Sequence, residues 1–269
     1  MSDSMFIFNR RTVRRHRDRA AASFGEHDFL ITDVAEKLAD RLDDIQRSFP
    51  VALDLGCHNG GLGRRLNGRG AIETLFACDL SQAMAATAGP LATAADEEFL
   101  PFADDSFDLV LSNLSLHWVN DLPGTLSQLK RVIKPGGLLL AAMLGGDTLK
   151  ELRHALAAAE AACEGGLSPR VSPFADVRDG GNLLARAGFT GSVADSETIT
   201  VSYQHPMGLL ADLRGMGETN AVAKSRKGFT QRTTMMHAMA AYQETFGDED
   251  GRIPATFQVI YLTGWVAEA

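Results

Sequence analysis

Residues 51–60 read VALDLGCHNG, and this stretch decides the fold. Its first five residues form a short apolar run of the kind that makes a buried strand. The glycines that follow, Gly56 and Gly60, predict a tight turn that a ligand can approach closely. The pattern over 61–67 then favours a helix. Because ligands of open parallel sheets lie beyond the carboxyl ends of the strands, this turn is the first candidate for a binding site.

Strands and helices alternate along most of the chain, which predicts an α/β fold with a doubly wound, mostly parallel sheet. The expected strands beyond the first lie at 72–79, 91–95, 107–114, 138–143, 193–203 and 256–264. The expected helices include 28–48, 121–133, 147–163 and 176–187. We therefore predict a seven-stranded sheet with a helical insertion before the last strand. The expected parts are an N-terminal basic segment and helix (1–48), a cofactor-binding core (49–203), an inserted cap (204–253) and the last strand (254–269).

The charge of the chain is acidic overall and basic at its start. The net charge is −8 and the isoelectric point is near 5.4, which argues against a nucleic-acid partner. Without residues 1–19, which hold six arginines and two aspartates, 20 basic and 32 acidic residues leave a net charge of −12. Two interpretations of this arginine cluster stay open. It is either a solvated helix face or a docking surface for an acidic partner or an anionic membrane.

Cysteine usage and hydropathy bear on location. Cys57, Cys78 and Cys163 are widely spaced and form no Cys-x-x-Cys pair, which is typical of a reducing cytoplasm. No apolar run reaches the length of about 18 residues that a transmembrane helix needs. The first residues also lack the pattern of a signal peptide. We predict a cytoplasmic protein, with peripheral contact to the inner membrane through its basic segment as an option.

The turn at 56–60 excludes two common ligands. The dinucleotide fingerprint needs a glycine where His58 stands, and the phosphate-binding loop needs a lysine that this turn lacks. A nucleoside without phosphates is the remaining class. Acids at the ends of the next two strands suit it, because Asp79 can accept from ribose hydroxyls and Asp96 or Glu97 from an adenine amino group. The candidate cofactor residues are Asp54, Gly56, Cys57, Gly60, Asp79, Leu80, Asp96, Glu97 and Asn113.

Four stretches together resemble the class I S-adenosylmethionine (SAM)-dependent methyltransferase superfamily. They are VALDLGCHNG, the acid of FACDLS, ADEEFLPFADDSFDLV and LKRVIKPGGLLL, in this order. The resemblance implies SAM as the cofactor. His58 departs from the family pattern, and three interpretations stay open: the backbone there needs no positive φ, the side chain narrows the methionine end or contacts substrate, or it weakens cofactor binding.

A closer resemblance covers about Phe8 to Trp265. NLSLHWVNDLP, GGDTLKELRHAL, DLRGMGETN and DGRIPATFQVIYLTGW are similar to a mitochondrial complex I assembly-factor group and its bacterial relatives. The chain begins almost where the family's shared region begins, as expected for a bacterial member. This resemblance implies modification of a protein side chain, with an arginine of a complex I core subunit as substrate, by hydroxylation or methylation. No two-histidine-one-carboxylate, haem or iron–sulfur pattern is visible, so we predict no metal site.

Two other functions stay open. The chain also resembles the malonyl carrier-protein O-methyltransferases of biotin synthesis, whose small acid or acyl-carrier substrate would need basic residues such as Arg153, Arg214 or the N-terminal arginines. The third hypothesis is that the chain is a non-catalytic assembly chaperone that binds SAM.

The candidate reaction residues follow the fourth and fifth strands. His117 is a candidate base or orienting group, and Asp147 is either a helix N-cap or, with Glu151, a partner for a guanidinium. The insertion residues Met216, Glu218 and Asn220 are candidates for a substrate lid. The expected substrate contacts are Ser115, Trp118, Glu151, Tyr203 and Met216.

Overall fold

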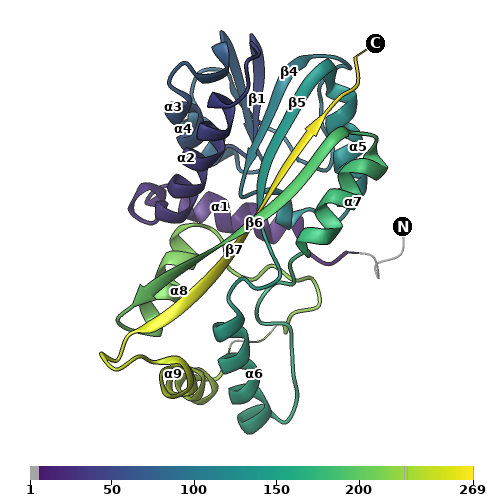
Figure 1. Cartoon of the computed structure of the whole chain (residues 1–269). Helices are drawn as coiled ribbons and strands as arrows, with labels where there is room; N and C mark the ends of the chain where they lie inside the picture. Colours follow the sequence, from purple (N-terminus) through teal and green to yellow (C-terminus); the bar gives the residue numbers. More distant parts are fainter. Residues whose placement is uncertain (1–5, 227, 229, 269) are drawn as a thin grey trace.

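The computed structural model describes residues 6–226, 228 and 230–268, which form a seven-stranded sheet with helices on both faces (Figure 1). The strand order is β3-β2-β1-β4-β5-β7-β6. All pairs from β3 to β5 are parallel, and β7 is antiparallel to both β5 and β6. The winding therefore reverses between β1 and β4, which is where such sheets bind ligands. The strands are β1 (Val51–Leu55), β2 (Thr74–Asp79), β3 (Ala92–Ala94), β4 (Phe107–Asn113), β5 (Ile133–Leu144), β6 (Thr190–Tyr203) and β7 (Ile253–Trp265).

Nine α-helices are found in the described ranges, and those predicted from the sequence are confirmed with small shifts at their ends. For example, the expected helix over 28–48 ends at Asp43. The predicted fifth strand starts earlier than expected, because Ile133 already pairs with Phe107. The helices are α1 (Arg10–Ala20), α2 (Phe29–Asp43), α3 (Gly61–Leu66), α4 (Gln82–Ala88), α5 (Leu122–Val132), α6 (Lys150–Glu164), α7 (Val177–Ala187), α8 (Pro206–Gly215) and α9 (Arg232–Phe246).

The central strands are buried on both faces. Leu109 and Leu111 of β4 belong to a hydrophobic cluster with Leu38 of α2. Val110, between them, belongs to a second cluster with Leu129 of α5. Because successive side chains of a strand point to opposite faces, these two clusters lie on the two sides of the sheet. This double cover holds the carboxyl ends of β1, β2 and β4 rigidly.

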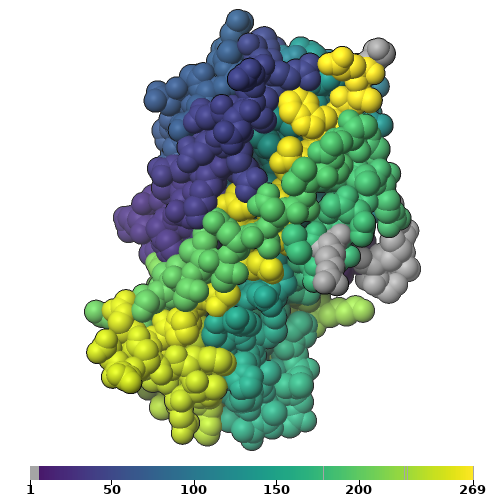
Figure 2. Space-filling model, in the orientation of Figure 1, coloured from purple at the N-terminus to yellow at the C-terminus, as the bar shows by residue number. Residues whose placement is uncertain are grey.

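The insertion extends the molecule beyond the sheet. It contains α8 and α9, and the long antiparallel pair of β6 and β7 carries it away from the parallel strands (Figure 1). Figure 2 shows α9 and α6 side by side at this end of the molecule, and contacts between the two helices agree. No helix among the described residues is long and apolar enough to cross a membrane.

Helix α1 lies across the carboxyl edge of the sheet and joins it to the insertion. Asn9 caps the helix through the Thr12 amide, and its own amide donates to the Ala221 carbonyl at 2.8 Å. Phe8 pairs with Val222 as an isolated bridge. The buried face of α1 carries Val13 and Arg17. The interpretation of the arginine cluster as a solvated face is therefore wrong for its buried members, because α1 packs with one side on the protein.

Candidate functional site

The turn after β1 depends on its two glycines. Gly56 has φ +69°, and a Cβ there would lie 2.1 Å from the Ser115 Oγ. Gly60 has φ +77°, and a Cβ would lie 2.7 Å from the Ala88 carbonyl oxygen. The amides of Gly56 and Cys57 donate to the Cys78 carbonyl at 2.8 and 3.0 Å. Close packing against β2, α4 and Ser115 therefore requires glycine at both positions.

His58 has a positive φ of 48°, so the interpretation that no positive φ is needed there is wrong. A non-glycine residue in this region carries strain that its surroundings must offset. The imidazole Nε2 lies 3.1 Å from the Asn113 carbonyl, and the ring stacks on Phe24 at 5.4 Å between centroids. The His58 amide donates to Asp79 Oδ2 at 3.1 Å. Burial and Arg17 lower the pKa of His58, so the ring is neutral at physiological pH.

The carboxylates that are expected to bind the nucleoside lie close together and are buried. Asp79 ends β2, and Glu97 follows β3; both are completely buried. Ser115, just after β4, donates from Oγ to Glu97 Oε1 at 2.6 Å. Asp79 also accepts from the Ser81 amide at 2.7 Å. The structure thus brings together the side chains that the sequence assigned separately to ribose and adenine.

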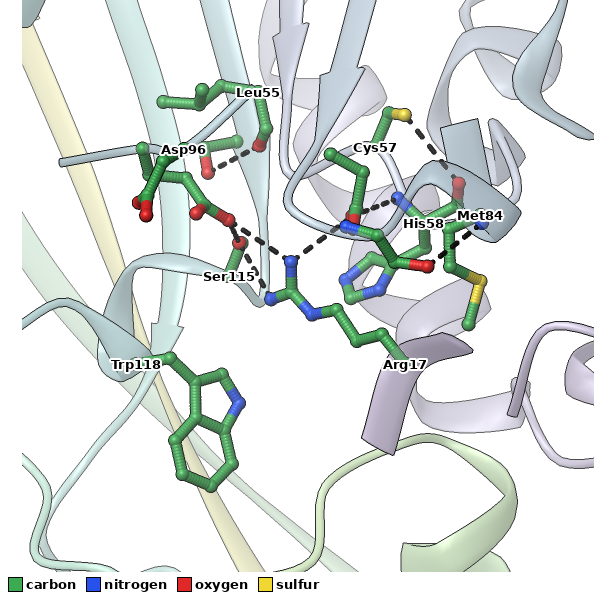
Figure 3. Close-up of polar contacts among 12 residues, drawn as sticks. Arg17, Leu55, Cys57, His58, Met84, Asp96, Ser115 and Trp118 are labelled. Carbon is green, nitrogen blue, oxygen red and sulfur yellow. Dashed lines mark hydrogen bonds and ion pairs between the residues drawn. The ribbon is translucent and has the colours of Figure 1, made fainter. Parts of the chain in front are cut away.

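A guanidinium of the chain itself sits on these acceptors. Arg17 reaches in from α1 and donates to Asp79 at 3.2 Å, Glu97 at 3.1 Å and Ser115 at 2.9 Å (Figure 3). Its side chain is fully buried. Burial alone would lower the pKa of Arg17, but the two carboxylates outweigh it and raise that pKa. This residue therefore stays charged, and it occupies the position expected for the nucleoside.

Arg10, which lies on the same face of α1 as Arg17, completes the cluster. It contacts Asp96 at 2.6 Å and also pairs with Glu97. Burial would raise the pKa of Glu97, but Arg10 and Arg17 lower it to about 2. Asp96 also accepts from the Glu98 amide at 3.0 Å. Sequence reasoning missed Arg10 and Arg17, although the spacing of Arg10, Val13, Arg17 and Ala20 is that of one helix face.

Asp54 lies beneath the turn and lacks partners. Neither of its carboxylate oxygens has a hydrogen bond, although both are buried. Burial, with a smaller contribution from Asp79, raises the pKa of Asp54 to about 7. A buried acid without partners is costly to keep ionised. Its free oxygens therefore fit a donor such as a cationic amino group.

The residues after β4 form a second polar group. His117 Nε2 lies 2.9 Å from Glu218 Oε2, and the Trp118 Nε1 donates to the same carboxylate at 3.0 and 3.1 Å. Burial would raise the pKa of Glu218, but His117 and Arg17 outweigh it and lower that pKa. Asn113 differs from expectation: its amide donates to the Ile31 carbonyl at 2.8 Å and so ties β4 to α2.

Glu218 also lines a large open cavity of about 890 Å³. Its apolar wall includes Leu152 of α6 and Leu210 of α8. Four arginines line it as well: Arg19, Arg170, Arg214 and Arg226. The volume lies in the range of about 300–1,000 Å³ that is typical of ligand pockets. The cavity borders the helix that carries Arg17, because His16 and Arg19 of α1 also line it.

Several expected site residues lie elsewhere. Asp147 is exposed and outside this cavity, and it is not an N-cap, because α6 begins after Leu149. Glu151 is buried against Thr256, whose amide and hydroxyl occupy its carboxylate. Both positions contradict the idea of a joint guanidinium site.

Three further assignments change with the structure. Tyr203 and Met216 are buried in the main core, and neither lines the open cavity. Arg153 donates to the carbonyls of Gly146 and Thr148 and so holds a turn. Leu80 packs in a small cluster with Phe8 and Trp118. Among the described residues, no group of three or more His, Cys, Asp and Glu side chains is arranged to hold a metal ion.

Comparison with known proteins shows the family to which the chain belongs. Residues 53–141 match a methyltransferase domain family. The mitochondrial arginine hydroxylase NDUFAF5 of Danio rerio is 44% identical over 268 residues, which cover 97% of this chain and 83% of that protein. The Homo sapiens protein is 45% identical over 96% of this chain and 76% of its own length. The malonyl-[acyl-carrier protein] O-methyltransferase of Halorhodospira halophila is 37% identical, covering 96% and 88%.

Solved structures show the same fold. The YcgJ protein of Bacillus subtilis matches with a TM-score of 0.59 at 15% identity, covering 86% of this chain and 98% of that one. A Haemonchus contortus phosphoethanolamine N-methyltransferase in complex with SAM matches with a TM-score of 0.56 at 16% identity, covering 96% and 60%. At these identities the likeness concerns the fold alone.

Proposed function

This chain belongs to the family of the NDUFAF5 arginine hydroxylases, within the SAM-dependent methyltransferase superfamily, and we propose that it modifies an arginine of a respiratory complex I subunit during assembly. Identity of 44% over nearly the whole chain, insertion included, supports this function. The reaction is either methylation, in which the sulfonium methyl of SAM replaces a proton of the side chain, or hydroxylation, which inserts one atom of O2 and needs two electrons and two protons from an external reductant to release the other atom as water. The same proposal puts the protein in the bacterial cytoplasm, beside the membrane that carries complex I.

The residues of the carboxylate cluster fit SAM as the cofactor. In this proposal Asp79 accepts from the ribose hydroxyls, and Asp96 and Glu97 lie on the adenine side. Asp54 meets the amino group, since its buried oxygens have no other partner. When bound, SAM supplies a sulfonium methyl group. Arg17 must leave Asp79 before the ribose can take its place.

The observation that carries the arginine substrate is the position of Glu218. Its carboxylate lines the open cavity, and its pKa, lowered mainly by His117 and also by Arg17, keeps it ionised. A buried carboxylate recognises a guanidinium through charge-assisted hydrogen bonds. His117 and Trp118 fix its orientation, so the incoming side chain meets a preset acceptor. His117 is then a positioning residue, because its Nε2 is engaged with Glu218.

A second function has its own support. Relatives that methylate a malonyl carrier protein are 32–37% identical to this chain. The arginines at the cavity suit a carboxylate substrate of that kind. In that case SAM would methylate a carboxylate oxygen of a small acid, and Glu218 would not contact the acceptor.

Peptide mass spectrometry of the complex I subunits tests the proposal. Subunits from bacterial cells with and without this gene are digested and compared. We expect an arginine that gains about 16 Da, for hydroxylation, or about 14 Da, for methylation, only when the gene is present. The strain that carries Asp79→Ala is the control, because this variant is expected not to bind the cofactor. If every subunit has the same mass in all strains, the arginine function is wrong and the acyl-carrier substrate becomes the first choice.

A further inference from the structure

The arginines of the 890 Å³ cavity are not equivalent. Arg170 contacts Glu160 at 2.9 Å and Glu164 at 3.3 Å, and Arg226 also pairs with Glu164. These two cations are therefore matched by two buried acids. They belong to the packing of the cavity wall, so they leave no net charge for a ligand.

Arg19 of α1 and Arg214 of α8 differ from that pair. Among the described residues, no carboxylate lies within ion-pair distance of either side chain, and Arg19 makes only a long contact of 3.4 Å with Thr219 Oγ1. Both residues are exposed. Both line the same cavity, and partial burial together with the positive charge of Arg214 lowers the pKa of Arg19. Two like charges held together without a counter-ion attract an anionic group.

A carboxylate of the opposite sign lines the same cavity. Among the described residues that line the cavity, Glu218 is the only acid, and its side chain is 7% exposed. Apolar side chains such as Leu213 and Phe174 line the same cavity. The cavity therefore combines two cations without acidic partners, apolar wall residues and one carboxylate. Apolar walls suit the methylene groups of a long side chain whose charged head lies beyond them.

We propose that this cavity binds a polypeptide segment in which an arginine is flanked by acidic residues. The arginine guanidinium binds Glu218, and the flanking carboxylates bind Arg19 and Arg214. This inference rests on the proposed function and adds to it the sequence context of the substrate. A small dicarboxylic acid would pair with Arg19 and Arg214 but leave Glu218 facing a ligand of its own sign.

Three labelled synthetic peptides test the inference by fluorescence anisotropy, at low salt and with S-adenosylhomocysteine present. One has arginine between two glutamates, the second replaces the glutamates by glutamine, and the third keeps the glutamates and replaces the arginine by glutamine. We expect the first to bind at least tenfold more tightly than either of the others. Arg19→Gln combined with Arg214→Gln should remove the preference for glutamate. Arg11→Gln combined with Arg14→Gln, which removes two exposed charges of α1 outside the cavity, should preserve it.

Glu218→Gln tests the carboxylate that is proposed to bind the arginine guanidinium. It should weaken both arginine peptides at least tenfold and leave the third peptide unchanged. The inference is overturned if the glutamate preference survives in the Arg19/Arg214 variant, or if the peptide without arginine binds as tightly as the first. The exposed arginine variants keep the test valid should Glu218→Gln fail to fold. Binding of the peptides is independent of chemistry, so unchanged subunit masses with charge-dependent binding would refute the proposed reaction alone.

Discussion

Two neighbouring regions at the carboxyl edge of the sheet differ in what occupies them. In the carboxylate cluster, a guanidinium of the chain itself already sits on Asp79, Glu97 and Ser115. The adjoining cavity of about 890 Å³ is open, and among the described residues no acid pairs with two of its exposed arginines, Arg19 and Arg214. One site is thus satisfied internally, and the other is preformed for a ligand.

The same helix borders both regions. Arg17 of α1 points into the cluster, while His16 and Arg19 of α1 line the cavity. In the proposed function, cofactor binding displaces the Arg17 side chain from Asp79, and any shift of α1 also moves Arg19. We infer that the filled site and the open site are coupled through α1. The predictions below test that contrast, beginning with the largest expected effect.

Arg17→Ala should lower the free energy of unfolding by about 3–5 kcal/mol, because it leaves buried carboxylates without their cation. Urea unfolding followed by circular dichroism measures the change. Arg11→Ala removes an exposed arginine of the same helix and should stay within about 0.5 kcal/mol of the parent. Equal, small losses for both variants would show that the Arg17 ion pairs do not form in solution, and the contrast between filled and open sites would fall.

Asp54→Asn should remove a pH dependence of stability. In the folded chain the pKa of Asp54 is raised to about 7, so between about pH 4 and 7 the folded form keeps a proton that the unfolded form has lost. The contribution of this group to stability therefore falls as pH rises through that window. The Asn variant should be more stable than the parent above pH 7, by up to about 4 kcal/mol, and equal to it near pH 4.

Unfolding free energies measured every half pH unit check this prediction. A constant difference across the whole range would mean that Asp54 titrates normally. In that case a partner reaches its carboxylate in solution, and the filled site is less closed than the structure indicates.

Asp79→Ala should abolish binding of S-adenosylhomocysteine, with a loss of at least a hundredfold, or about 2.8 kcal/mol. The ribose hydroxyls lose their acceptor, and the turn loses the bond to the His58 amide. Titration calorimetry on a variant shown to be folded measures the effect. Unchanged affinity would mean that the cofactor lies outside the carboxylate cluster, whatever Arg17 does.

The sequence predicted much of this cluster because its parts follow local rules. Buried strands are visible as apolar runs, and an acid directly after such a strand must lie at the carboxyl edge, where Asp79 and Glu97 are found. Glycine in the turn also has a local cause. These features depend on neighbours close in the chain, which a single sequence displays.

The filling of the cluster depends on distant residues, and so it was missed. Arg17 binds residues 62, 80 and 98 positions away along the chain. An arginine-rich helix looks solvated when only its own composition is considered. His58 is similar, since its strained backbone is held by Phe24 and the Asn113 carbonyl.

Arg17→Gln should have the opposite effect to Asp79→Ala. We expect S-adenosylhomocysteine to bind about tenfold more tightly than to the parent. The cofactor no longer has to break the ion pairs with Asp79 and Glu97, while glutamine keeps some hydrogen bonding. Calorimetry under the conditions used for Asp79→Ala gives the comparison. Tenfold weaker binding would show instead that Arg17 changes partners and holds the bound cofactor, so that it would be a ligand of the cofactor and not its competitor.

Asp147→Ala should have the smallest effect, because this residue lies outside both regions. The residue is exposed, and in the part of the chain that the structure describes it bonds through its backbone, with its amide donating to Gln258 Oε1 at 3.1 Å. We expect stability within about 0.5 kcal/mol of the parent, with cofactor affinity and peptide affinity unchanged. A clear loss of peptide affinity would extend the open region to the turn after β5. The acceptor site would then have two acids, Glu218 and Asp147, and the positive charges of Arg19 and Arg214 would no longer outweigh their negative charge.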